Sequence, residues 1–439
     1  MINPAKSDLI KPALSKEEMS KTFGLALQKK NLITDDDTAL IFYDLSFIKQ
    51  RIINLRELFP PGTLHAIAVK ANPLAKILTQ IKDTGSGLEV ASLPELHLAE
   101  KVGFPPERIV FDSPSKTKKE IEYALQMGVM LNADSFAELE RIEEILTRIK
   151  TTSLIGVRIN PQVGAGTIKS TSVADAVSKF GIPLDNNREK LTEYYVRYNW
   201  LKGIHVHTGS QGMPVHLMIE GIRKVLFFAN QVNKALEEHP IKRKIEIFDI
   251  GGGLAVSYHE DRKPVSMDEY LSMLKDNFKE LFKGQFSLVT EFGRYIHANA
   301  GWAASKVEYV KRENGYNIIM THVGADLLLR KCYNPNDWHH QITVTDKEGK
   351  LKTGLDKNKY MVAGPLCFAG DVIAKDLELP VVEEGDYILI HDIGAYTLSM
   401  WSRYNSRQIP KVIGYQPGQD DFEIIKHREN KEDIFEFWS

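Results

Sequence analysis

The stretch His65-Ala66-Ile67-Ala68-Val69-Lys70-Ala71-Asn72-Pro73 joins an apolar, β-prone run to a lysine and a chain breaker. Apolar residues of this kind favour a buried strand, and Asn-Pro is typical of the loop that ends one. A lysine at the end of a buried strand must be paired or covalently occupied. Removal from water favours loss of its proton, and the neutral amine is a nucleophile toward aldehydes. We therefore predict that Lys70 is a reactive residue.

Seven further β-type runs follow this one, and helical periodicity lies between several of them. The predicted strands are residues 87–92, 108–113, 129–134, 155–160, 203–208, 245–250 and 288–293, and the clearest predicted helices are residues 94–102, 118–127 and 136–149. Alternation of this kind predicts parallel βα units. Eight such units in this length predict an α/β fold, a (β/α)8 barrel of the TIM type.

Most of the predicted strands finish in polar residues, at the end where barrel enzymes carry their chemistry. These residues are Lys70, Glu89, Asp112, Asp134, Arg158 with Asn160, His205 with His207, Asp249, and Glu291 with Arg294. The structural alternative is that each residue only caps its own strand. The occurrence of the whole set in one chain favours a shared site.

The composition excludes several classes of function. The chain has 439 residues, 43% of them hydrophobic, and a formal net charge of −2, so it lacks the basic surface expected for nucleic acid or an anionic membrane. Its two cysteines, Cys332 and Cys367, give no disulfide framework, as is typical of a reducing compartment. The first thirty residues lack the apolar segment of a signal peptide, and no run reaches the ~20 apolar residues of a membrane span. We therefore expect a cytoplasmic protein.

The chain changes character on both sides of the predicted barrel. Near Gly301 the βα rhythm ends, and a Glu-Asn-Gly turn at residues 313–315 predicts a β-hairpin between two β-type runs. At the other end, Ser15-Lys16-Glu17-Glu18 matches a helix capping box. We predict three segments. Residues 1–45 form a helix and a first strand that pack with the C-terminal domain, residues 46–300 form the barrel, and residues 301–439 form the β-rich C-terminal domain.

A glycine loop, Gly251-Gly252-Gly253, directly follows the seventh predicted strand. Glycines let the backbone approach an anion, and barrel enzymes often bind phosphate with the loops after strands seven and eight. Ser210 and Arg294 add a hydroxyl and a guanidinium to the same end of the barrel. A tight turn is the structural alternative for the glycines. A phosphate site, an aldehyde-reactive lysine and a histidine that can stack on a ring, His207, together predict pyridoxal 5′-phosphate (PLP).

Glu291 stands at the end of the eighth predicted strand. A carboxylate beside the pyridine nitrogen of PLP keeps that nitrogen protonated, so the ring withdraws electrons from the substrate Cα, as decarboxylation requires. A racemase, which must limit this withdrawal, is expected to use a weaker partner such as arginine. An ion pair between Glu291 and Arg294 is the structural alternative.

Several motifs together resemble the fold-type III PLP decarboxylases, the group of ornithine, arginine and diaminopimelate decarboxylases. They are Val69-Lys70-Ala71-Asn72, Glu89-Val90-Ala91-Ser92, Arg158-Ile159-Asn160-Pro161, Lys179-Phe180-Gly181-Ile182, His205 to Gln211, Asp249 to Gly253, Glu291-Phe292-Gly293-Arg294, Gly364 to Asp371, Gly394 to Met400, and Tyr404 to Arg407. The resemblance covers nearly the whole chain and is greatest to the diaminopimelate branch. It implies conversion of meso-diaminopimelate to lysine and CO₂, in lysine biosynthesis, by a homodimer with sites at the interface.

The resemblance also implies a role for each matching residue. Lys70 resembles the lysine that holds the cofactor, His207 the histidine stacked on its ring, and Glu291 the partner of the ring nitrogen. The implied phosphate binders are Ser210, Gly252, Gly253, Arg294 and Tyr396, and Gly251 is a further cofactor-binding residue. Glu89 and Arg158 resemble a pair behind the lysine. Cys367 resembles a cysteine that reaches in from the partner subunit and returns a proton to Cα. The implied substrate-binding residues are Arg330, Tyr333, Phe368 and Asp371.

Two residues depart from the pattern of the family. Phe292 replaces a proline, and Phe368 replaces the carboxylate that meets the substrate's distal ammonium in diaminopimelate and ornithine decarboxylases. A phenyl ring cannot supply this charge, which predicts weak turnover of diamino acids unless another carboxylate substitutes. A decarboxylase of a different amino acid in specialised metabolism is therefore an alternative.

Two other classes of function are disfavoured. Glu291 and Cys367 argue against a racemase, and the retained Lys70 and glycine loop argue against a non-catalytic regulator. No motif indicates a metal triad or a dinucleotide.

Overall fold

The computed structural model describes residues 14–240, 242–259, 263–354 and 356–439. The chain forms two compact units. We call residues 52–256 with 263–295 the barrel unit, and the described parts of residues 1–51, 257–262 and 296–439 the sheet unit. The stretch before residue 14, on which part of the signal-peptide prediction rests, lies outside the described residues.

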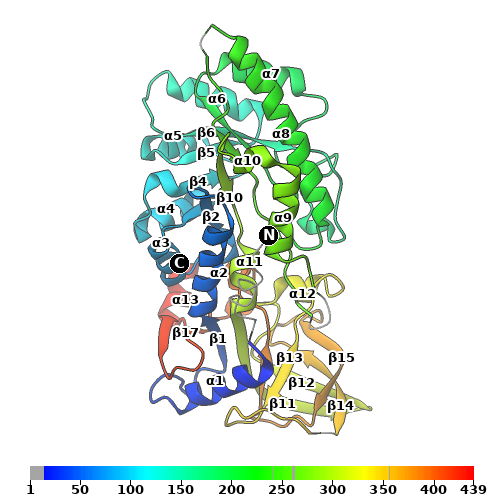
Figure 1. Cartoon of the computed structure of the whole chain (residues 1–439). Helices are drawn as coiled ribbons and strands as arrows, with labels where there is room; N and C mark the ends of the chain where they lie inside the picture. Colours follow the sequence, from blue (N-terminus) through cyan, green and yellow to red (C-terminus); the bar gives the residue numbers. More distant parts are fainter. Residues whose placement is uncertain (1–13, 241, 260–262, 355) are drawn as a thin grey trace. The chain divides into compact units, whose positions relative to one another are not determined.

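The barrel unit is built on a parallel sheet that closes on itself (Figure 1). In sheet order its strands are β2 (Leu64–Ala68), β3 (Gly87–Val90), β4 (Ile109–Asp112), β5 (Met130–Ala133), β6 (Ile155–Asn160), β8 (Leu201–Val206), β9 (Ile247–Asp249) and β10 (Ser287–Thr290). Strand β10 pairs with β2 and closes the barrel, and the short β7 (Ile182–Pro183) pairs with β6. These eight strands lie where the sequence predicts them, so the predicted (β/α)8 barrel is confirmed.

Helices alternate with the barrel strands. They are α2 (Leu45–Leu58), α3 (Ala75–Asp83), α4 (Leu93–Val102), α5 (Lys118–Met127), α6 (Phe136–Leu146), α7 (Arg188–Arg197), α8 (Val215–Glu238), α9 (Met267–Asn277), α10 (Lys279–Phe282) and α11 (Arg294–His297). Ser92, Thr117 and Ser135 start three of these helices, and each side chain accepts a hydrogen bond from the backbone three residues on. The predicted helices are confirmed, and the third ends at Leu146, three residues earlier than predicted.

The barrel interior holds charged side chains among apolar ones. Strands β3, β4 and β5 are buried along their whole length. Glu89, His205 and Asp249 nevertheless have no measurable exposure, and their side chains come from three different strands. Charged groups are rarely buried so fully without a partner. The interior of this barrel is therefore a site as well as a core.

The sheet unit contains a nine-stranded mixed sheet. Its strands are β1 (Ala39–Asp44), β11 (Gly301–Glu313), β12 (Tyr316–Thr321), β13 (Ile342–Thr345), β14 (Lys357–Ala363), β15 (Val372–Pro380), β16 (Tyr387–Ile390), β17 (Lys411–Tyr415) and β18 (Phe422–Lys426), and its helices are α1 (Lys16–Gln28), α12 (Leu329–Tyr333) and α13 (Lys431–Trp438). Strand β1 pairs with β11 and β17, and Phe23 of α1 packs edge-on against Phe42 and Trp302. An N-terminal strand is thus part of a sheet formed mainly by the C-terminal residues.

Two local predictions are confirmed in the sheet unit. Ser15 and Glu18 form the capping box that starts α1. Strands β11 and β12 pair as an antiparallel hairpin, with Asn314 and Gly315 both at positive φ in the turn. Among the helices that the structure describes, none combines the length and apolar character needed to cross a membrane.

Candidate active site

Lys70 lies just beyond the end of β2, and its amine pairs with Glu89 at the end of β3. The Nζ atom lies 2.6 Å from each carboxylate oxygen of Glu89. Burial raises the pKa of Glu89 to about 8, although the nearby lysine acts in the opposite direction. The predicted pairing of Lys70 is present. The predicted desolvation is wrong, because the lysine follows the strand in a 3-10 turn, η2 (Val69–Ala71), where 42% of its side chain is exposed.

The glycine loop after β9 leaves no room for side chains. Gly251 has a φ of +66°, and a Cβ atom there would lie 2.7 Å from Nδ1 of His207. A Cβ atom on Gly252 or Gly253 would collide with the backbone of Glu291 or Gly209. The loop therefore requires glycine at all three positions, and its backbone can come close to a bound group.

The predicted phosphate binders of the barrel unit lie around this loop. The N–H of Gly252 donates to Nδ1 of His207 at 3.1 Å, and Nε of Arg294 donates to Oγ of Ser210 at 3.2 Å. Burial, together with the Arg158 guanidinium, lowers the pKa of His207 to about 3. His207 is therefore a neutral, flat ring held beside a loop of backbone donors, with a hydroxyl and a guanidinium close by.

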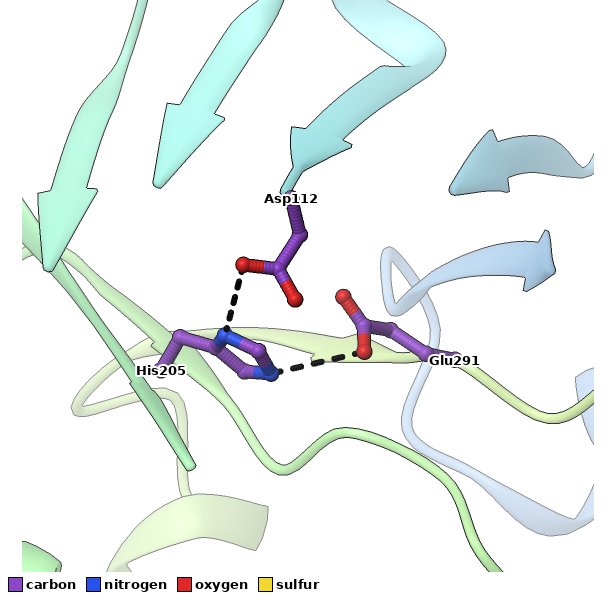
Figure 2. A group of neighbouring side chains, drawn as sticks. All are labelled: Asp112, His205 and Glu291. Atoms are coloured by element: carbon purple, nitrogen blue, oxygen red, sulfur yellow. Dashed lines mark ion pairs between the residues drawn. The ribbon is translucent and has the colours of Figure 1, made fainter. Parts of the chain in front are cut away.

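Four buried charged residues alternate in sign across the barrel interior, and we call them the charge row. Glu291 Oε2 lies 3.4 Å from His205 Nε2, and His205 Nδ1 lies 3.6 Å from Asp112 Oδ1 (Figure 2). Asp112 Oδ2 in turn accepts a hydrogen bond from Arg158 Nη1 at 2.8 Å. Each of the four side chains is at most 7% exposed.

The charge row sets the ionisation of its members. Burial alone would raise the pKa of Asp112 and Glu291, but Arg158 and His205 hold that of Asp112 well below its usual range, and His205 lowers that of Glu291. Burial alone would lower the pKa of His205, but Glu291 and Asp112 raise it well above its ordinary value. The row therefore consists of two carboxylates, an imidazolium and a guanidinium.

Asp112, His205 and Glu291 also have the residue types and spacing of a metal-ligand cluster. The geometry favours ion pairs instead, because each ring nitrogen of His205 is directed at a different carboxylate (Figure 2). A metal-bound imidazole would direct one nitrogen lone pair at the ion.

The sequence places His205 and Asp112 among the polar strand ends of a shared site, but the family resemblance assigns neither of them a role. A signal for His205 is present in its spacing from His207, because residues two apart on a strand face the same side. Phe292, the departure after Glu291, is 1% exposed and packs against Phe59, Tyr270 and Tyr295. It is therefore part of the local core.

The other predicted site residues belong to the sheet unit. Cys367 is exposed, and the neighbouring Phe368 ring lies 5.6 Å from that of Tyr333 and 6.1 Å from that of Tyr404. Asp371 is 3% exposed and accepts hydrogen bonds at 2.6 Å from two backbone N–H groups, those of residues 325 and 366. Its carboxylate therefore orders the loop that carries Cys367.

Arg330 and Tyr396, which the resemblance assigns to substrate and phosphate, lie together in the sheet unit. The Arg330 guanidinium lies 4.8 Å from the centre of the Tyr396 ring and 4.9 Å from that of Trp338. Its Nε donates to the sulfur of Met400 at 3.1 Å. These contacts fix the guanidinium between aromatic faces.

A family model for the pyridoxal binding domain of pyridoxal-dependent decarboxylases matches residues 45–298. The chain belongs to the pyridoxal-dependent decarboxylase family. A diaminopimelate decarboxylase from Aquifex aeolicus is 32% identical over 98% of this chain and 95% of its own length. The solved diaminopimelate decarboxylase from Helicobacter pylori, complexed with L-lysine, is 31% identical with a TM-score of 0.80, over 91% of this chain and 96% of that one. The predicted family, PLP cofactor and carboxy-lyase activity are therefore confirmed.

The barrel of this decarboxylase fits its cofactor. Oε1 of Glu291 is buried and has no hydrogen-bond partner among the described residues. A buried oxygen without a donor costs about 1–3 kcal/mol, so this atom is suited to accept a hydrogen bond from a bound group. Ser210 and Arg294 lie next to the glycine loop and supply a hydroxyl and a guanidinium suited to a phosphate group.

Proposed function

We propose that this decarboxylase removes one carboxyl group of meso-diaminopimelate and releases lysine and CO₂. The ionised, buried Glu291, with one oxygen open to a donor, carries the proposal of decarboxylation. The choice of substrate is supported by the Aquifex aeolicus relative, which is similar over nearly the full length of both chains. The two free cysteines are compatible with a cytoplasmic enzyme, which is the location we propose.

Bound PLP would supply an electron sink for the bond that breaks at Cα. Lys70 would hold the cofactor, and Glu89 would orient the lysine amine. The glycine loop, with Ser210 and Arg294, would bind the phosphate, and His207, held by the Gly252 N–H, would lie against the ring. Glu291 would accept a hydrogen bond from the ring nitrogen.

Loss of CO₂ leaves a site on Cα that must receive a proton, and we propose that Cys367 donates it. We further propose that the enzyme is a homodimer in which each Cys367 serves the site of the other subunit. Exposure of Cys367 on its loop supports this arrangement, since a residue that serves another chain must be accessible at the surface.

Mixing two inactive variants, Lys70→Ala and Cys367→Ala, should restore activity. If subunits exchange at random, one site of each mixed dimer has both residues, so about a quarter of all sites recover. CO₂ release after partial unfolding and refolding of the mixture measures the recovery. Cys332→Ala, which removes the other free thiol, is the matched control and should stay active without mixing. No recovery in a mixture that demonstrably contains mixed dimers would mean that Cys367 does not act across subunits.

The substrate proposal is tested at Phe368. An ammonium that faces a phenyl ring loses a charge-assisted hydrogen bond worth about 1.5–3 kcal/mol, and cation–π attraction returns on the order of 0.5–2 kcal/mol. Phe368→Glu should therefore raise kcat/KM for meso-diaminopimelate by up to roughly sixtyfold. Phe368→Leu, which removes the ring without adding charge, should give no such gain. CO₂ release from a panel of meso-diaminopimelate, ornithine, lysine and amino acids without a distal ammonium measures these values.

A second candidate is decarboxylation of an amino acid that lacks a distal ammonium. It is favoured by the aromatic surroundings of Phe368, whose ring lies near Tyr333 and Tyr404. Turnover of such a substrate, without turnover of meso-diaminopimelate, would establish this candidate and exclude the first. Ordinary efficiency of the unaltered enzyme on meso-diaminopimelate, with no gain from Phe368→Glu, would show that residue 368 does not meet the distal ammonium.

A further inference from the structure

His205 is buried at the centre of the barrel, and charged groups face it from several strands. Arg158 on β6 and Asp249 on β9 are its register partners, Asp112 lies at the end of β4, and Glu291 follows β10. Burial raises the pKa of Asp249 well above its usual range, and the negative charge of Glu291 adds to this effect, so Asp249 is uncharged. The two nearby lysines form ion pairs with other carboxylates: Lys70 pairs with Glu89, and Lys116 pairs with Glu138.

The His205 ring lies within ion-pair distance of two carboxylates, and neither ring nitrogen makes a hydrogen bond with another described residue. Both nitrogens face carboxylate oxygens, at 3.6 and 3.4 Å, in the view of Figure 2. A neutral imidazole has one N–H and one lone pair. In this position the lone pair would point at a carboxylate oxygen, which is repulsive. Only the imidazolium offers a donor on each side.

The charge of His205 also decides the charge of Glu291. If His205 were neutral, the charge row would hold two carboxylates and one guanidinium, and the Arg158 guanidinium already donates a hydrogen bond to Asp112. Glu291 would then be a buried carboxylate whose remaining nearby cation, Lys70, is paired with Glu89. A group in that position takes up a proton rather than remain charged. A protonated Glu291 cannot hold a proton on the ring nitrogen.

We propose that His205 is a positioning residue that keeps Glu291 ionised and directs its open oxygen at the ring nitrogen of PLP. Contact with His205 engages Oε2 of Glu291, and Oε1 is the oxygen that has no partner among the described side chains. His205 acts through Glu291 and does not itself take part in the reaction. This inference rests on the proposed role of Glu291.

The first test measures the protonation of His205 in the full-length, PLP-loaded enzyme. Nitrogen NMR of ring-labelled histidine resolves the two ring nitrogens, and the signals missing in His205→Gln belong to His205. Both nitrogens should carry protons at neutral pH and above it, where an ordinary histidine is mostly uncharged. His65 is the matched control, because it is also buried and bonds Thr290 at 2.8 Å, but burial lowers its pKa to about 4. A neutral His205 near pH 7 would overturn the proposal.

The second test measures the ring nitrogen itself. With PLP labelled at that nitrogen, its NMR signal should show a proton in the unaltered enzyme and loss of that proton in His205→Gln. The same variant should lower kcat roughly tenfold to a hundredfold, with smaller changes in KM and PLP retention. His205→Lys, which restores a cation, should recover part of the protonation. His65→Gln should leave the ring nitrogen protonated, and thermal unfolding checks that each variant is folded.

The outcomes separate this inference from the proposed function. A folded His205→Gln enzyme that keeps the ring nitrogen protonated, with unchanged kcat, would refute a role for His205 through Glu291. A doubly protonated His205 in an enzyme that releases no CO₂ from any substrate would refute the proposed function, yet it would support the ion-pair arrangement argued here.

Discussion

Lys70→Ala should abolish decarboxylation, and it should remove the residue to which borohydride links the cofactor. The lysine is the nucleophile that attaches the PLP aldehyde, and no other group replaces a missing covalent residue. We expect kcat to fall by about a thousandfold or more, the scale seen when a covalent residue is removed. Borohydride reduction of the yellow, PLP-loaded enzyme, followed by peptide mass spectrometry, should place the adduct on Lys70.

The fold should survive this substitution for a specific reason. Lys70 opposes the effect of burial on Glu89, so removing the lysine moves the already raised pKa of Glu89 further upward. Glu89 is then neutral at neutral pH and no uncompensated charge stays buried. Thermal unfolding of Lys70→Ala close to that of the unaltered protein checks this point.

Lys118 is the matched control for Lys70. Its amine pairs with Glu144 at 2.6 Å, but both side chains are about half exposed. A surface ion pair contributes about 0–1 kcal/mol to the free energy of unfolding. Lys118→Ala should therefore keep its activity and its adduct on Lys70. An adduct on a lysine other than Lys70 in the unaltered enzyme would contradict the assignment.

Glu291→Gln should slow decarboxylation far more than it weakens cofactor binding. A glutamine cannot keep the ring nitrogen protonated, so the electron sink becomes weaker at the step that needs it. Loss of one preorganised electrostatic contact of this kind typically lowers kcat by about 10²–10³-fold. PLP retention, measured by dialysis and cofactor absorbance, should change less, because the glycine loop, Ser210 and Arg294 are unaltered.

Arg294→Ala is the reciprocal variant. It removes the guanidinium that bonds Ser210 beside the glycine loop, so it should weaken PLP retention. With excess PLP its kcat should recover, whereas that of Glu291→Gln should not. Full kcat in Glu291→Gln would show that Glu291 does not control the ring nitrogen.

The local part of this structure was predictable from the sequence. Short apolar runs with polar ends predict the eight barrel strands, because burial and β propensity act on neighbouring residues. The capping box at Ser15, the Asn314-Gly315 turn and the glycine loop at residues 251–253 are also local, since each is set by the hydrogen bonding or backbone freedom of a few adjacent residues. With the resemblance of its motifs, the chain thus determined its own fold, cofactor and reaction type.

The charge row was decided by the tertiary structure alone. Asp112, Arg158, His205 and Glu291 come from four separate parts of the chain, and closure of the barrel brings them within ion-pair distance. The ionisation of a buried group depends on charges within a few ångströms, and these come from strands that are distant in sequence. The exposure of Lys70 depends likewise on the 3-10 turn after β2. Residue type and spacing therefore indicated which groups carry the chemistry, while their protonation required the closed barrel.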